Sequence, residues 1–70
     1  MKFQVNYLFN SSQVHQLHLI VPVLRGGKFG FCILEPQDGD CWNGPEEFET
    51  AEQAIAAGKS NLAQYLAELE

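Results

Sequence analysis

Residues 17–35, LHLIVPVLRGGKFGFCILE, decide the fold, because two apolar runs flank the pair Gly26-Gly27. Adjacent glycines accept the positive φ angles that a two-residue hairpin loop requires. β-Branched residues are dense before this pair, and Pro22 would break a helix, so residues 14–24 are expected to form a strand. Because proline lacks an N–H, this strand should end, bulge or lie on an edge near Pro22. A second strand, over residues 28–35, is predicted from alternating large apolar residues: Phe29, Phe31 and Ile33.

A further strand before this hairpin is predicted over residues 2–9, where apolar and polar residues alternate. The polar run Asn10-Ser11-Ser12 has turn chemistry and is expected to reverse the chain into residues 14–24. One face of the sheet is assigned to the aromatic residues. The second face is then expected to carry four apolar residues: Leu8, Ile20, Cys32 and Leu34.

Another turn is predicted at residues 36–40, PQDGD, and residues 41–43 can then pair briefly as a fourth strand.

The C-terminal third is predicted to be helical. Thr50-Ala51-Glu52-Gln53 is a capping box, so a helix begins near Ala51. Gly58 in this helix is expected to allow close packing on the sheet. An apolar stripe runs along one side of the helix: Ala51, Ala54, Ile55, Gly58, Leu62, Tyr65, Leu66 and Leu69.

These elements predict a single α+β domain over residues 1–70, because a chain of 70 residues is too short for two hydrophobic cores. The expected architecture is a three- to four-stranded antiparallel meander with one C-terminal helix packed on one face. One helix cannot cover both faces of such a sheet. The remaining apolar face is therefore expected to bind a second copy of the chain or another protein.

The charge distribution argues for a protein partner. Nine acidic residues against four basic ones give a net charge of −5, which disfavours direct binding to nucleic acid. Six of the acids lie between Asp38 and Glu52, and this cluster could be a solvated loop or a docking surface for a basic partner. The candidate partner-binding residues are Asp38, Asp40, Trp42, Glu46 and Glu47.

No catalytic, cofactor-binding or metal site is predicted. His15, His18, Cys32 and Cys41 are zinc-ligand types, but they lack the close paired spacing of zinc sites. On one continuous strand, the two histidines would point to opposite faces. If Asp38-Gly39 is the hairpin turn, Cys41 faces Pro36 and lies about 13 Å from Cys32, too far for a disulfide. An enzyme is therefore not expected.

The location expected from the sequence is the cytoplasm. The first nine residues carry one basic residue and have no continuous apolar segment, so no secretory signal is predicted. The most apolar run, residues 17–24, is far shorter than the roughly 20 residues that cross a bilayer, and no membrane association is expected.

A set of residues in the C-terminal half follows the pattern of a known family: Pro36, Gly39, Cys41, Gly44, Thr50-Ala51-Glu52-Gln53-Ala54-Ile55 and Asn61-Leu62-Ala63-Gln64-Tyr65-Leu66. In these residues the chain resembles the N-terminal half of HicB-type antitoxins, and also similar small sheet-plus-helix domains of unknown function. The resemblance to the antitoxins implies a short antiparallel sheet packed against the helix, the neutralisation of a small basic ribonuclease toxin, and a place near the partner surface for Trp42, Glu46 and Glu47. The sequence thus leads to a non-enzymatic protein-interaction module, with an antitoxin domain as the alternative.

Overall fold

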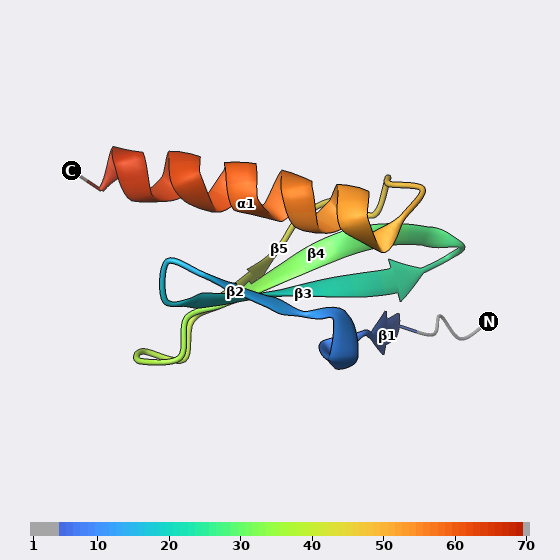
Figure 1. Ribbon diagram of the computed structural model, residues 1–70, viewed down its shortest axis with the longest axis horizontal. Coiled ribbons are helices and arrows are strands. Elements are labelled where there is room, and N and C mark those ends of the chain that lie inside the picture. The colour runs from blue at the N-terminus through green and yellow to red at the C-terminus, as the bar shows by residue number, and fades with distance from the viewer. Residues whose placement is uncertain (1–4, 70) are drawn as a thin grey trace.

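The computed structural model describes residues 5–69, which form one antiparallel sheet with a long helix across one of its faces (Figure 1). This arrangement confirms the α+β class, and the sheet has five strands rather than three to four. The strand order is β1-β3-β4-β5, and β2 also pairs with β3. The elements are β1 (Val5–Tyr7), the 3-10 turn η1 (Phe9–Ser11), β2 (Gln13–His15), β3 (His18–Arg25), β4 (Lys28–Leu34), β5 (Cys41–Asn43) and α1 (Ala51–Glu68).

The β3–β4 hairpin is confirmed as the centre of the sheet. Gly26 and Gly27 have φ angles of 60° and 80°, and Arg25 pairs with Lys28 across the two-residue loop. This loop sets the register of the hairpin, in which Pro22 lies opposite Phe31. Every residue of β3 from Leu19 to Arg25 has a partner on β4.

Pro22 lies inside β3, so of the three alternatives expected near this residue, the strand neither ends nor lies on an edge of the sheet there. The Pro22 carbonyl accepts a hydrogen bond from the Leu8 N–H at 2.9 Å. The reciprocal donor is missing in proline, and the Leu8 carbonyl instead accepts from the Ser11 N–H at 2.9 Å, within η1. The irregularity required by Pro22 is therefore located in the neighbouring edge of the sheet.

That outer edge is made of two short strands, β1 and β2, on either side of η1. Tyr7 pairs with Val23, and Gln13 pairs with Ile20. Tyr7 and Gln13 are six residues apart on the outer edge, whereas their partners Val23 and Ile20 are three residues apart on β3. Three extra residues are therefore accommodated at η1. The predicted reversal at residues 10–12 is wrong, because both strands run in the same direction there.

The chain reverses at Gln16 and Leu17 instead. His15 pairs with His18, and the two loop residues between them have φ angles of 50° and 67°. The prediction of one strand over residues 14–24 is therefore wrong, because this tight turn divides it into β2 and β3. Neither Gly nor Asn marks the turn, and its position could not be read from the usual turn residues.

The two faces of the sheet carry separate apolar clusters. The helix side holds Ile20, Phe31 and Ile33, which pack with Ile55 and Leu62 of α1. The opposite side holds the buried residues Val21, Val23 and Cys32, with Leu19 and Leu34 packed against them. The assignment of Ile20 to the second face is wrong, because the Gly26-Gly27 loop places it opposite Ile33.

Helix α1 begins at the predicted capping box. The Gln53 N–H donates to Thr50 Oγ1 at 3.1 Å, and Gln53 Oε1 accepts from the Thr50 N–H at 3.3 Å. Gly58 is buried, and a Cβ added there would lie 2.8 Å from Ile20 Cγ2, which confirms the predicted close approach to the sheet. The end of α1 extends past the strands (Figure 1). Tyr65 and Leu69 of the predicted apolar stripe are exposed.

Candidate functional site

The outer edge of the sheet exposes most of the large apolar side chains that the described residues leave in solvent. Tyr7 and Phe9 stack with ring centroids 5.8 Å apart, and Phe9 is 57% exposed. We call this group the apolar edge. Its members lie in β1, η1, β2 and the turn that follows: Val5, Tyr7, Phe9, Val14 and Leu17.

Leu17 carries two unfavourable features at once. Its side chain is 77% exposed, and its backbone has a φ of 67°, in the left-handed region that costs an L-residue roughly 1–2 kcal/mol. Val14, 74% exposed, lies on the preceding strand opposite Leu19. A leucine in such a turn stabilises neither the turn nor the core, which indicates a role outside the folded chain.

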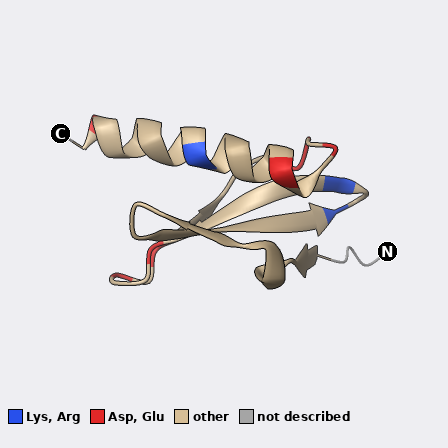
Figure 2. Ribbon diagram, viewed as in Figure 1, with Lys and Arg blue, Asp and Glu red and all other residues tan. Residues whose placement is uncertain are grey.

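The structure divides the acidic candidates between two ends of the molecule. Asp38 and Asp40 are exposed in the β4–β5 loop. Glu46 and Glu47 lie in the segment between β5 and α1, and Figures 1 and 2 show this segment at the opposite end from the loop. The five predicted partner-binding residues therefore do not form one continuous patch.

Two ion pairs fasten the segment before α1 to the β3–β4 hairpin. Arg25 Nη1 lies 3.6 Å from Glu46 Oε1, and Lys28 pairs with Glu49. Pro45 and Glu46 also lie close over Gly30, where an added Cβ would come within 3.0 Å of the Pro45 carbonyl oxygen. Glu46 is thus used within the chain, whereas Glu47 is exposed.

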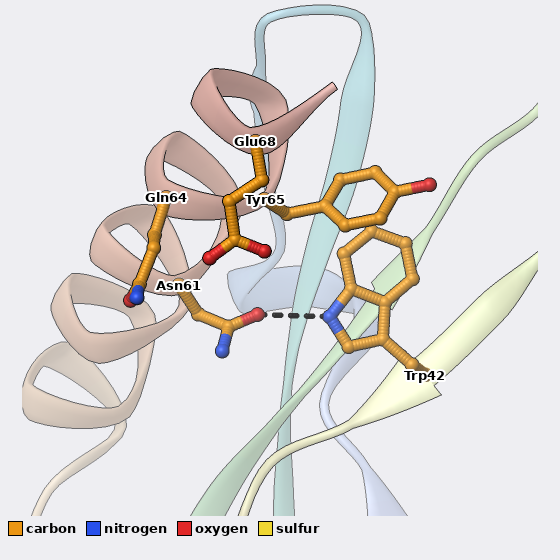
Figure 3. A pocket seen from close by; sticks show the side chains of 5 residues that line it. All are labelled: Trp42, Asn61, Gln64, Tyr65 and Glu68. Carbon is orange, nitrogen blue, oxygen red and sulfur yellow. Dashed lines mark hydrogen bonds between the residues drawn. The ribbon is translucent and has the colours of Figure 1, made fainter. Parts of the chain in front are cut away.

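Trp42 lies on the helix side of β5, opposite Ile33 of β4. Its indole Nε1–H donates to Asn61 Oδ1 at 2.9 Å, and its ring lies 4.9 Å from the ring of Tyr65, tilted by 44°. These two aromatic rings and three polar helix side chains line an open groove, which we call the Trp42 groove (Figure 3). Its lining residues are Trp42, Asn61, Gln64, Tyr65 and Glu68.

The polar side chains that α1 contributes to this groove were not predicted from the sequence. Asn61, Gln64 and Glu68 follow helical spacing on the polar side of the apolar stripe, and this pattern is shared by ordinary solvated helix faces. Their contact with Trp42 depends on where β5 packs against α1, which local spacing does not encode. The useful signal was Tyr65, an aromatic residue near the end of the stripe.

The two histidines are cross-strand partners on the helix side of the sheet, so the prediction that they diverge is wrong. It assumed a continuous strand, and the turn at Gln16 and Leu17 removes that assumption. His18 is buried, and its Nδ1–H donates to the Gln16 carbonyl at 2.9 Å. Among residues 5–69, no three His, Cys, Asp or Glu side chains are grouped so that they could hold a metal ion.

Cys32 and Cys41 are free thiols, the first buried and the second exposed. Cys41 lies opposite Leu34 rather than Pro36, because the β4–β5 loop is wider than a tight turn at Asp38-Gly39. The two cysteines are therefore closer along the sheet than predicted. Burial, followed by the nearby Cys41, raises the pKa of the Cys32 thiol above its ordinary value.

Glu35 closes the β4–β5 loop. Its carboxylate accepts hydrogen bonds from the Asp38 N–H and from the Gln37 N–H, the latter at 3.0 Å. The hydrogen bond from the Asp38 backbone N–H is the main reason why the pKa of Glu35 is below its ordinary value. The Glu35 carboxylate thus stabilises the turn at the start of the loop that carries Asp38 and Asp40.

Comparisons with protein-family models, with curated proteins and with solved structures found no match to this chain. Within the described residues, α1 and the other elements include no helix with the length and apolar character needed to cross a membrane. The surface features that could bind a partner are the apolar edge, the β4–β5 loop with Asp38 and Asp40, and the Trp42 groove.

Proposed function

We propose that the protein is a non-enzymatic protein-interaction module that binds a second copy of itself or another protein through the apolar edge. The observation that carries this proposal is Leu17, which is 77% exposed and held at a φ of 67°. Both features cost stability, and a partner that buries the side chain would offset them. Val14 and Phe9 extend the same surface along the sheet edge.

Two further features support the proposal. The Trp42 groove offers indole, phenol, amide and carboxylate groups, which bind ligands by stacking and hydrogen bonding, and it contains no nucleophile beside a base. The exposed thiol of Cys41 favours a reducing compartment, and we place the protein in the cytoplasm.

The test of this proposal compares the wild type with the double variant Val14→Thr/Leu17→Asn. Threonine keeps the β-branch needed in β2, and asparagine tolerates the positive φ at position 17. Sedimentation velocity across the micromolar range is expected to show that the wild type self-associates and that the double variant does not. If the wild type is monomeric, affinity capture from native extract is expected to retain a protein on the wild type that the double variant does not retain.

The matched control is Leu69→Asn, which removes a similarly exposed leucine, 65% exposed, from the far end of α1. This variant is expected to behave like the wild type in both measurements. A wild type that stays monomeric and retains the same proteins as the double variant would overturn the proposal.

The resemblance to HicB-type antitoxins gives a narrower alternative, in which the partner is a small basic ribonuclease toxin. The antiparallel sheet with one helix supports it, and so do the exposed acids Asp38, Asp40 and Glu47, which suit a basic partner. Co-expression with a basic ribonuclease encoded beside its gene is expected to rescue growth. Continued toxicity, with both proteins present in soluble form, would rule this alternative out.

A further inference from the structure

The Trp42 groove has the composition of a site for a positively charged planar group. It is formed between β5, which contributes Trp42, and the C-terminal half of α1, which contributes the remaining side chains (Figure 3). Tyr65 lies over the indole, Glu68 projects from the following turn of the helix, and Gln64 points away from the indole. The groove is open to solvent, so it suits the end of a side chain better than an enclosed small molecule.

The aromatic part of the groove is held in place before any ligand binds. The indole N–H of Trp42 is occupied by Asn61 Oδ1 at 2.9 Å, and the His18 ring packs edge-on to the indole with centroids 6.1 Å apart. Tyr65 packs on it at 4.9 Å. The indole ring therefore has three neighbours that fix its orientation, so little side-chain entropy would be lost on binding.

The charge of the groove is negative and is not neutralised within the described chain. Glu68 lies in the last turn of α1, where the helix dipole is negative, and this turn contains no basic residue. Arg25 and Lys28 form their ion pairs with Glu46 and Glu49, in the segment before α1. A carboxylate in this place destabilises the helix end slightly, and a bound cation would reverse that effect.

Three features of the groove thus favour the same ligand. Aromatic ring faces attract cations, arginine more often than lysine, and the planar guanidinium group also stacks on them. A carboxylate binds guanidinium through two parallel hydrogen bonds. The carbonyl end of α1 adds negative potential. We propose that the Trp42 groove binds an arginine side chain of a partner protein, which packs against the exposed parts of the Trp42 and Tyr65 rings and pairs with Glu68.

The proposal is independent of the apolar edge, since none of the groove residues belongs to that surface. The test uses the full chain and three synthetic peptides, acetyl-Gly-Xaa-Gly-amide, in which Xaa is arginine, citrulline or lysine. Citrulline has the shape of arginine without its charge. Trp42 is the single tryptophan of the chain, so its fluorescence reports binding at the groove.

Saturable binding of the arginine peptide is expected, weaker by at least about fivefold for citrulline and about threefold for lysine. Glu68→Gln and Tyr65→Leu should each weaken arginine binding by at least about threefold. Glu52→Gln, a matched loss of charge in the first turn of α1, should leave the affinity unchanged, and so should Val14→Thr/Leu17→Asn.

Glu68→Gln is also expected to raise the melting temperature while it weakens binding, which a merely structural carboxylate would not do. The proposal is overturned if the arginine peptide causes no saturable change in fluorescence, or if the citrulline or lysine peptide binds as tightly. Equal weakening by Glu52→Gln and Glu68→Gln would show a general effect of the net charge, and would overturn it as well.

Discussion

At the scale of single residues, the most informative position is Leu17. Type I′ hairpin turns place both loop residues at positive φ and favour Asn-Gly, and this chain has Gln16 and Leu17 there instead. The observed angles of 50° and 67° place two ordinary residues in the left-handed region. Local sequence rules could not locate this turn, because the residues break the rules on which such predictions depend.

Replacement of Leu17 by glycine should stabilise the fold. Glycine removes the strain of the left-handed backbone, which stabilises the folded state by roughly 1–2 kcal/mol. The greater freedom of glycine in the unfolded chain destabilises the folded state by about 0.5–1 kcal/mol. The expected gain in the free energy of unfolding is therefore about 0.5–1 kcal/mol, measured by urea denaturation. A loss of stability would show that the Leu17 side chain packs within the monomer.

The two thiols should react at different rates with a thiol reagent such as Ellman's reagent at mildly alkaline pH. Cys41 is exposed and should react at once, whereas Cys32 is buried and its pKa is raised, so its reaction should be slower by at least about tenfold. Cys41→Ser should remove the fast phase and leave the slow one. Two equal fast phases would contradict the burial of Cys32.

At the scale of elements, the fold depends on how closely α1 approaches the β3–β4 hairpin. Gly58 lies over Ile20 and Phe31 at the centre of the helix-side cluster. The capping box at Thr50 and the glycine in the apolar stripe were sufficient to predict the helix start and the close packing. Ile20 was assigned to the wrong face of the sheet, although the Gly26-Gly27 loop already implied that it lies opposite Ile33.

Gly58→Ala should destabilise the protein despite the better helix propensity of alanine. The propensity gain is about 1 kcal/mol, but the new methyl group would lie 2.8 Å from Ile20 Cγ2 and 3.2 Å from Phe31 Cγ. Overpacking of a core typically costs about 1–3 kcal/mol, so a net loss of about 1 kcal/mol is expected in thermal unfolding.

The control for this variant is Ala56→Gly on the exposed side of α1, which should lose about 1 kcal/mol from propensity alone. If Gly58→Ala instead gained about as much as Ala56→Gly loses, the helix would have space at Gly58 and the close contact would be refuted.

The β4–β5 loop should respond to acid through Glu35. Its pKa is lower in the folded chain than in the unfolded one, so its stabilising contribution is present above the unfolded pKa and is lost as the pH falls through the folded pKa. As the pH falls below the ordinary pKa of a glutamate, the amide proton shifts of Gln37 and Asp38 should move as the carboxylate is protonated. In Glu35→Gln, the same two signals should no longer follow a titration.

At the scale of the whole molecule, local signals predicted the class and the central hairpin, whereas the Trp42 groove was missed because it depends on contacts distant in the chain. Trp42 and Asn61 are 19 positions apart, and their hydrogen bond depends on the final packing of β5 against α1. The separation of the acidic residues also results from the fold, because β5 lies between the two acidic segments. Charge counts along a chain do not show which residues share a surface.

The domain is expected to unfold in one cooperative step. Trp42 reports the contact between β5 and α1, while far-ultraviolet circular dichroism reports mainly the helix, so the two probes should give the same urea midpoint. A fluorescence change that precedes the loss of helix signal would show that β5 and α1 separate first. That result would divide the chain into units that unfold independently.

The interruption of the outer edge by η1 also limits aggregation. Long edges with free amide and carbonyl groups template further strands and can lead to fibres. Here β1 and β2 have three residues each, and the Leu8 and Phe9 carbonyls between them are used by Ser11 and Ser12 at 2.9 and 3.1 Å. The edge can therefore expose apolar side chains for recognition without a continuous backbone template. Association there is limited to contacts that match those side chains, and the residue that interrupts the hydrogen bonding of the edge is Pro22, on the neighbouring strand.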